Sequence, residues 1–147
     1  MDSLDFLHAN LAAVAVYTPI VAGLVLLAGR RLPASFASGF AFAGFALPLL
    51  LGVWLVAPWP GQRIAYQQLT SVGAPWGFDF GLNGLSAPLF LMTAVVGLAA
   101  GIKALVQQVE RRNTYLGLLL FMFGGTLGTF GTTSVLGAYF FHEFALI

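Results

Sequence analysis

The sequence predicts an all-α, polytopic membrane protein, a helical bundle of about four full transmembrane helices and a truncated fifth, with residues 1–147 forming one membrane region. Composition is the first observation, because 59% of the 147 residues are hydrophobic and only 7% are charged, whereas a soluble domain carries about 25% charged residues. The second observation is that four charge-free runs each reach the roughly 20 residues that a spanning helix needs. The third is a shorter apolar run at the end of the sequence.

Composition also excludes several classes of function. A net charge of +1 provides no basic field for nucleic acid. The absence of cysteine excludes disulfides, thiolate metal sites and a cysteine nucleophile. Two histidines, His8 and His142, are too few for a metal cluster. The first five residues lack the basic region of a signal peptide, so we expect the first apolar run to be retained as a helix.

The first two helices are predicted at residues 9–29 and 35–57. Each run contains one proline, Pro19 in the first and Pro48 in the second. Proline is tolerated inside a membrane helix when neighbouring helices satisfy the freed carbonyl. We therefore expect both helices to continue through their prolines.

Residues 63–80 form the longest polar connection. Tyrosine and tryptophan side chains favour the headgroup level of a bilayer, and this segment contains Tyr66 and Trp76. The pattern predicts an ordered extramembrane loop near the interface. Asp79 is interpreted as a loop charge, with Arg63 as a candidate ion-pair partner.

Asn83 is predicted to cap the third helix, at residues 84–102, because its side-chain oxygen can accept from the free amides of Leu85 or Ser86. Lys103 marks the predicted end of this helix. Its long side chain can reach the headgroups as an anchor, and a role in ion traffic is the alternative.

The fourth helix is predicted at residues 114–133, and the fifth begins at residue 134 and is cut at residue 147. At about 1.5 Å per residue the fifth segment climbs about 20 Å, short of the ~30 Å hydrocarbon core. Small residues at helix-contact spacing indicate a packed bundle; they are Gly97 with Gly101 and Gly124 with Gly128. Hydroxyl groups near the end of the fourth helix either bond back to helix carbonyls or line a hydrated path; they belong to Thr126, Thr129, Thr132, Thr133 and Ser134.

The distribution of lysine and arginine predicts the orientation. Arg30 and Arg31 lie between the first two helices, and Lys103, Arg111 and Arg112 lie between the third and the fourth. The positive-inside rule makes both connections cytoplasmic. The N-terminus is then outside, and the fifth helix enters the membrane from outside.

Glu143 is the main candidate functional residue. It follows the start of the fifth helix by nine residues, which is some 13 Å at about 1.5 Å per residue and therefore near mid-bilayer. A carboxylate at that depth costs roughly 3 kcal/mol and indicates proton exchange or an ion pair. The alternative is an acid that reaches an interface. The adjacent His142 is a second candidate for proton exchange, or else a hydrogen-bonded packing residue.

Two stretches carry a resemblance to a known family. The stretch Gly81-Leu-Asn-Gly-Leu-Ser-Ala-Pro-Leu89, running on to Thr93, resembles the start of the third helix in antiporter-like subunits of respiratory complex I, the proton-translocating NADH–quinone oxidoreductase. The stretch Tyr139-Phe-Phe-His-Glu-Phe-Ala-Leu-Ile147 resembles the fifth helix of the same proteins. The better match is to subunit M, over its N-terminal quarter or third.

The resemblance implies a role for Glu143. It aligns with a glutamate that faces lysines in the membrane interior and takes part in moving protons. The later helices that bear those lysines are not in this sequence. Where the family usually has aspartate, this chain has Asn83, which preserves a cap but not a charge.

The resemblance also implies the setting of the chain. We expect a bacterial inner (cytoplasmic) membrane, with the lipid bilayer, the other membrane subunits of complex I and the missing C-terminal part of the same subunit as partners. No cofactor is expected to bind this chain. A cation/proton antiporter subunit of the Mrp type and a non-transporting structural membrane subunit remain the alternatives.

Overall fold

The computed structural model describes residues 3–29, 32–56, 71–72 and 78–146 of the chain. Five α-helices dominate these residues: α1 (Ser3–Ala28), α2 (Ala34–Val56), α3 (Ser86–Val106), α4 (Arg112–Gly131) and α5 (Val135–Ala145). A two-stranded antiparallel sheet joins β1 (Ser71–Val72) to β2 (Phe78–Asp79). Arg30, Arg31 and Arg63, on which several predictions depend, lie outside the described residues.

The predicted all-α membrane architecture is confirmed. Four of the described helices are long and apolar enough to cross a membrane; their spans are Asn10–Ala28, Ala34–Val56, Ser86–Val106 and Arg112–Gly131. Helices α1 and α2 run uninterrupted through Pro19 and Pro48, and both prolines are fully buried. Neighbouring helices therefore surround each proline, as expected for a proline inside a membrane helix.

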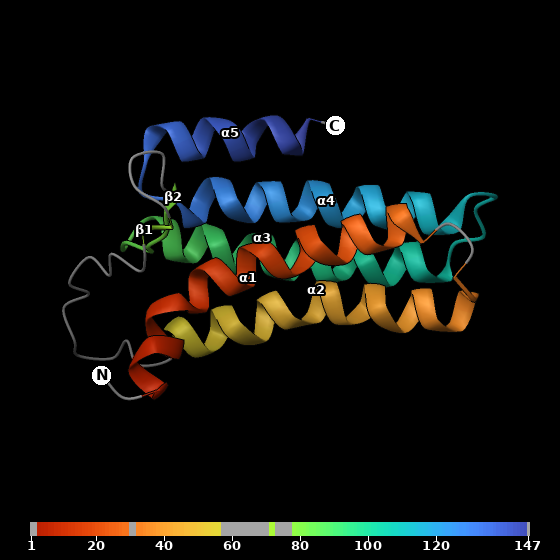
Figure 1. Cartoon of the computed structure of the whole chain (residues 1–147), viewed down its shortest axis with the longest axis horizontal. Helices are drawn as coiled ribbons and strands as arrows, with labels where there is room; N and C mark the ends of the chain where they lie inside the picture. The colour runs from red at the N-terminus through yellow and green to blue at the C-terminus, as the bar shows by residue number, and fades with distance from the viewer. Residues whose placement is uncertain (1–2, 30–31, 57–70, 73–77, 147) are drawn as a thin grey trace.

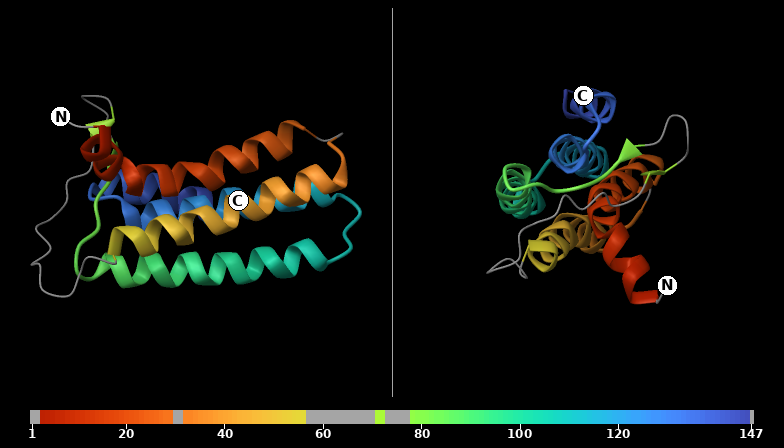
Figure 2. Two further views of the ribbon diagram at one scale, coloured as in Figure 1. Left: turned by 90° about the horizontal axis from the view of Figure 1, so that it is seen from below. Right: turned by 90° about the vertical axis from the view of Figure 1, so that its left-hand side faces the viewer.

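The four long helices lie side by side, and α5 lies along the outer side of α4 (Figures 1 and 2). Helix α4 is central, because it packs against α1, α3 and α5. Helix α5 packs mainly against α4 and β2, and its Phe141 also meets the ring of Tyr17 from α1 edge-on. The fifth helix is thus an addition to a four-helix bundle, with one face covered and the other open.

Glycines permit the close approach of α4 to its neighbours. Gly117 of α4 faces Gly23 of α1 so closely that a Cβ on Gly23 would lie 2.7 Å from the Gly117 carbonyl oxygen. Gly124 faces Ile20, and Gly97 of α3 faces the ring of Phe123. Such contacts between small residues hold helices together in lipid, where apolar side chains gain little by leaving the solvent.

Two helix boundaries differ from those predicted by four residues or more, and the other boundaries differ by one or two. Helix α1 begins at Ser3, earlier than the predicted residue 9. Helix α3 continues to Val106, so the prediction that Lys103 marks its end is wrong. Lys103 lies in the last turn, where a cation favours the helix dipole. An exposed lysine therefore did not stop this helix.

The prediction of a loop throughout residues 63–80 is wrong at its C-terminal end. Phe78 and Asp79 form strand β2, and Phe80 continues as an isolated antiparallel bridge to Thr132. Phe80 is completely buried and packs edge-on against Tyr17 of α1. This connection therefore contributes to the core of the bundle.

The connections α1–α2 and α3–α4 lie at the same end of the bundle, as expected from their positive charges. The Asn113 side-chain amide donates to the carbonyl oxygens of Gly29 and Leu32, over 3.4 Å and 3.2 Å. Strands β1 and β2 lie at the opposite end (Figure 1). Which end faces the cytoplasm stays a prediction.

Candidate functional site

The site is built from the corner between α4 and α5. The carbonyl oxygen of Asp79 accepts from the Thr132 hydroxyl at 2.8 Å, the Thr133 amide at 2.8 Å and the Thr133 hydroxyl at 3.3 Å. The Gly81 amide donates to the Gly131 carbonyl at 2.8 Å. Hydrogen bonds with Asp79 and Gly81 therefore hold the turn between α4 and α5, and they fix the point where α5 begins.

Ser134 caps α5. It has extended backbone angles, and its hydroxyl oxygen accepts from the Gly137 amide at 2.9 Å. A serine cap satisfies one of the amides that the first helical turn leaves free. Helix α5 therefore begins directly after Thr132 and Thr133, with only the capping Ser134 between them.

The hydroxyls near the end of α4 all have protein partners, but only those of Thr126 and Thr129 bond back to helix carbonyls as expected. Thr126 and Thr129 donate to the carbonyl oxygens of Met122 and Gly125, each at 3.0 Å and four residues back. Thr132 and Thr133 bond to Asp79, and Ser134 caps α5. Their arrangement is that of helix and corner stabilisation, and the alternative of a hydrated path gains no support from it.

Phe141 sets the rotation of α5. Its ring is 1% exposed and lies over Gly128 of α4. The ring is also 5.4 Å from that of Phe78 and 5.7 Å from that of Phe80, centroid to centroid. Because adjacent helical residues diverge by about 100°, the side chain two positions on points away from α4.

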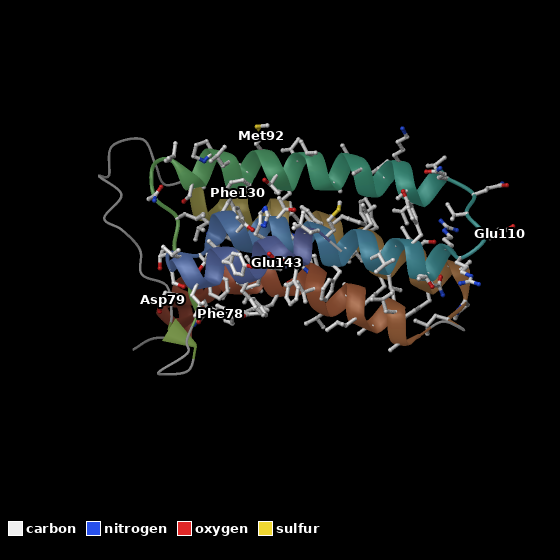
Figure 3. All side chains as sticks on the ribbon, turned by 90° about the horizontal axis from the view of Figure 1, so that it is seen from above. Phe78, Asp79, Met92, Glu110, Phe130 and Glu143 are labelled. Carbon is white, nitrogen blue, oxygen red and sulfur yellow. The ribbon has the colours of Figure 1, made fainter. Side chains whose placement is uncertain are left out.

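Glu143 therefore lies on the outward face of α5. Its side chain is exposed, together with those of Leu136, Tyr139, His142 and Leu146. Figure 3 shows Glu143 between the two ends of the bundle, with Asp79 near one end and Glu110 at the other. As the ninth residue of α5 it stands about 12 Å along the helix axis from Val135. The carboxylate is thus at intermediate depth and faces outward.

The charge of Glu143 is uncompensated in the described part of the chain. Between Asn113 and Gly131, helix α4 carries no charged residue. The neighbouring His142 is also exposed, on a side of α5 about 100° away. A carboxylate on an apolar, outward face can exchange a proton or pair with a cation that approaches from outside this bundle.

Asn83 makes the contacts expected of a cap. Its Oδ1 accepts from the amides of Leu85 at 2.9 Å and Ser86 at 2.8 Å. In return, the Asn83 amide donates to the Ser86 hydroxyl at 2.9 Å. These bonds are reciprocal, so Asn83 and Ser86 together define the start of α3.

Asp79 is more deeply placed than a loop charge. One of its carboxylate oxygens, Oδ1, is buried and has no hydrogen-bond partner among the residues that the structure describes. Its expected partner Arg63 is outside those residues. The carbonyl of Asp79 has the larger structural role, which no side-chain pattern in the sequence indicates.

The described residues contain no group of three or more histidine, aspartate or glutamate side chains that could hold a metal ion. The expectation that this chain binds no cofactor is untested by the structure. The candidate site therefore consists of the outward carboxylate of Glu143 and the neighbouring imidazole of His142, on an otherwise largely apolar helix.

Comparison with known proteins finds one similarity that covers most of the chain. It is 40% identical over 137 residues to NADH-quinone oxidoreductase subunit 13 of Thermus thermophilus. The aligned region covers 93% of this chain and 27% of that protein, so the chain spans about a quarter of the length of the curated relative it matches. No protein-family model matches the sequence.

Proposed function

We propose that this chain is the N-terminal part of a subunit M-like membrane subunit of a bacterial NADH–quinone oxidoreductase. In this proposal the subunit contributes to proton translocation coupled to electron transfer from NADH to quinone. Glu143 exchanges a proton or pairs with a cation on a later helix or a neighbouring membrane subunit. The chain lies in the inner membrane with its N-terminus outside.

The similarity to subunit 13 of Thermus thermophilus is the observation that carries the proposal. An identity of 40% continues over 93% of the chain, including long apolar segments whose composition alone does not fix residue identity. The name of this relative supports an NADH–quinone oxidoreductase over an Mrp-type antiporter, which the sequence motifs left open.

The placement of Glu143 supports the proton-handling role. The side chain is exposed on α5, on the side that neither α4 nor β2 covers. A bare carboxylate facing hydrocarbon is costly, so it requires a proton, a cation or water at that face. Electron carriers are left to other subunits, because the chain has no cysteine for an iron–sulfur cluster.

The test is Glu143→Gln in the full-length subunit within its assembled complex. NADH-driven proton uptake in inverted membrane vesicles should fall by roughly 100-fold or more, while the assembled complex persists on native gels. The matched control is Glu110→Gln, because Glu110 is an exposed carboxylate in the α3–α4 connection. The control should pump normally.

The alternatives give different results. Loss of assembly in Glu143→Gln, with normal pumping per assembled complex, would favour a structural subunit. Proton movement that needs a sodium gradient and continues without NADH would favour an Mrp-type antiporter. Normal pumping with full assembly would remove Glu143 from the mechanism.

A further inference from the structure

Strand β2 and the residue after it make two contacts, one with the turn before α5 and one with α5 itself. The first is the corner at Thr132 and Thr133, where the hydroxyls of both bond to the Asp79 carbonyl. The second is the aromatic contact of Phe78 and Phe80 with the α5 side chains. A connection between α2 and α3 thus holds both the start and the middle of a helix that follows α4.

The aromatic contact reaches close to the candidate carboxylate. The rings of Phe78 and Phe140 stack with centroids 4.9 Å apart, and Phe80 lies 5.7 Å from Phe141. Phe140 and Phe141 precede Glu143 by three and two residues. Any rotation of α5 that moves Glu143 must therefore move rings that β2 and Phe80 hold in place.

Helix α4 and one ring of α1 provide the rest of the support of α5. On α4, α5 lies over Gly125 and Gly128, and the ring of Phe121 lies 4.8 Å from that of Phe144. Tyr17 of α1 meets Phe141 edge-on, with centroids 6.4 Å apart. The glycines allow close approach but offer no side chain that would resist sliding or rotation. The hydrogen bonds and rings of the β2 segment therefore add to the directional part of the packing.

We propose that Thr132, Thr133 and Phe80 are positioning residues for Glu143, and that residues 78–80, at the end of the α2–α3 connection, set the rotation and depth of its carboxylate. This inference rests on the proposed function, since it concerns the same carboxylate. It assigns to the hydroxyls of Thr132 and Thr133 a role that those of Thr126 and Thr129 lack, because the latter bond only within α4.

The titratable groups near Glu143 are few. On α5 they are Tyr139 and His142, on β2 there is Asp79, and on α1 there is Tyr17, whose ring meets Phe141 edge-on. Helix α4 presents none along the stretch that packs on α5, since Tyr115 is near its other end and residues 116–131 contain no titratable side chain. A change in the behaviour of Glu143 after a threonine substitution therefore reports position, because no charge is added or removed.

The experiment measures the labelling of Glu143 by dicyclohexylcarbodiimide, which adds to a protonated carboxyl group and leaves a stable N-acylurea. The full-length subunit is labelled in its native membranes between pH 5.5 and 8.5, and the α5 peptide is quantified by mass spectrometry. The test variant is Thr132→Val with Thr133→Val. The control is Thr126→Val with Thr129→Val, and the rescue variant is Thr132→Ser with Thr133→Ser.

The test variant removes two hydroxyl hydrogen bonds to Asp79. It should label at Glu143 at least roughly fivefold more slowly, the factor that corresponds to one net hydrogen bond. The control and the rescue variant should stay within about twofold of the unsubstituted protein. Protein content per membrane, measured by immunoblot, corrects for any loss of folding.

Equal labelling in the test and control variants would overturn the inference. An equal loss of labelling in both variants would also overturn it, because the substitutions in α4 would then have the same effect as those that remove the hydrogen bonds to Asp79. The proposed function fails by a separate result, normal pumping in Glu143→Gln. The labelling comparison does not depend on pumping, so the two failures are distinguishable.

Discussion

The ring of Phe141 on α5 lies directly over Gly128 on α4. A Cβ on Gly128 would overlap the ring atoms of Phe141, and one on Gly125 would lie 2.8 Å from the Phe141 carbonyl oxygen. This glycine surface is what allows α5 to pack against α4 with Phe141 buried. The outward direction of Glu143 follows from that contact.

Replacement of Gly128 by alanine should therefore destabilise the protein by about 1–3 kcal/mol, the usual effect of overpacking a core. Gly39 of α2 is the matched control, because no atom lies within 4 Å of a Cβ placed there. Gly39→Ala should be neutral or stabilising by up to about 1 kcal/mol, since alanine is the better helix former. Thermal unfolding of the full-length subunit in detergent, followed by circular dichroism, measures both. Equal melting temperatures for the two variants would contradict the packing of α5 described here.

Replacement of Asn83 by alanine removes the oxygen that accepts from Leu85 and Ser86. The loss of such a cap should destabilise the protein by about 1 kcal/mol. Aspartate caps a helix as well as asparagine does, so Asn83→Asp should be close to neutral. The same unfolding measurement separates them. A large loss in Asn83→Asp alone would show that a charge at this position is harmful.

Reporter fusions test the orientation. The Asn113 bonds to Gly29 and Leu32 bring two connections together at one end. Alkaline phosphatase fused after Pro33 or after Gln108 should therefore be inactive, as in the cytoplasm, and fusion after Asp79 should be active. The excess of lysine and arginine at the first two sites is the physical reason. Activity at either of the first two sites would reverse the orientation or break the pairing of the loops.

Much of the fold was predictable from the sequence because membrane helices have a strong one-dimensional signal. Charge-free runs of about 20 residues locate the four long helices to within a few residues. The cap contacts of Asn83 were also accessible, since they are local in the sequence. The error at Lys103 arose because a single lysine can snorkel from a helix that continues.

The contacts around α5 were not predictable in the same way. Strands β1 and β2 have two residues each, too few for an alternating pattern to be visible. The bonds of Thr132 and Thr133 to Asp79 join residues more than 50 positions apart. The sequence identified Glu143 by its charge, but the direction of its side chain depends on how Phe141 packs on Gly128.

The hydrogen bonds of the connections have a mechanical consequence for the long helices. Asn113, at the start of α4, is hydrogen-bonded to the α1–α2 connection. Asp79, at the end of the α2–α3 connection, is hydrogen-bonded to the turn that follows α4. Rocking one helical hairpin against the other would break bonds at both ends at once. The four long helices are therefore expected to shift as a rigid block.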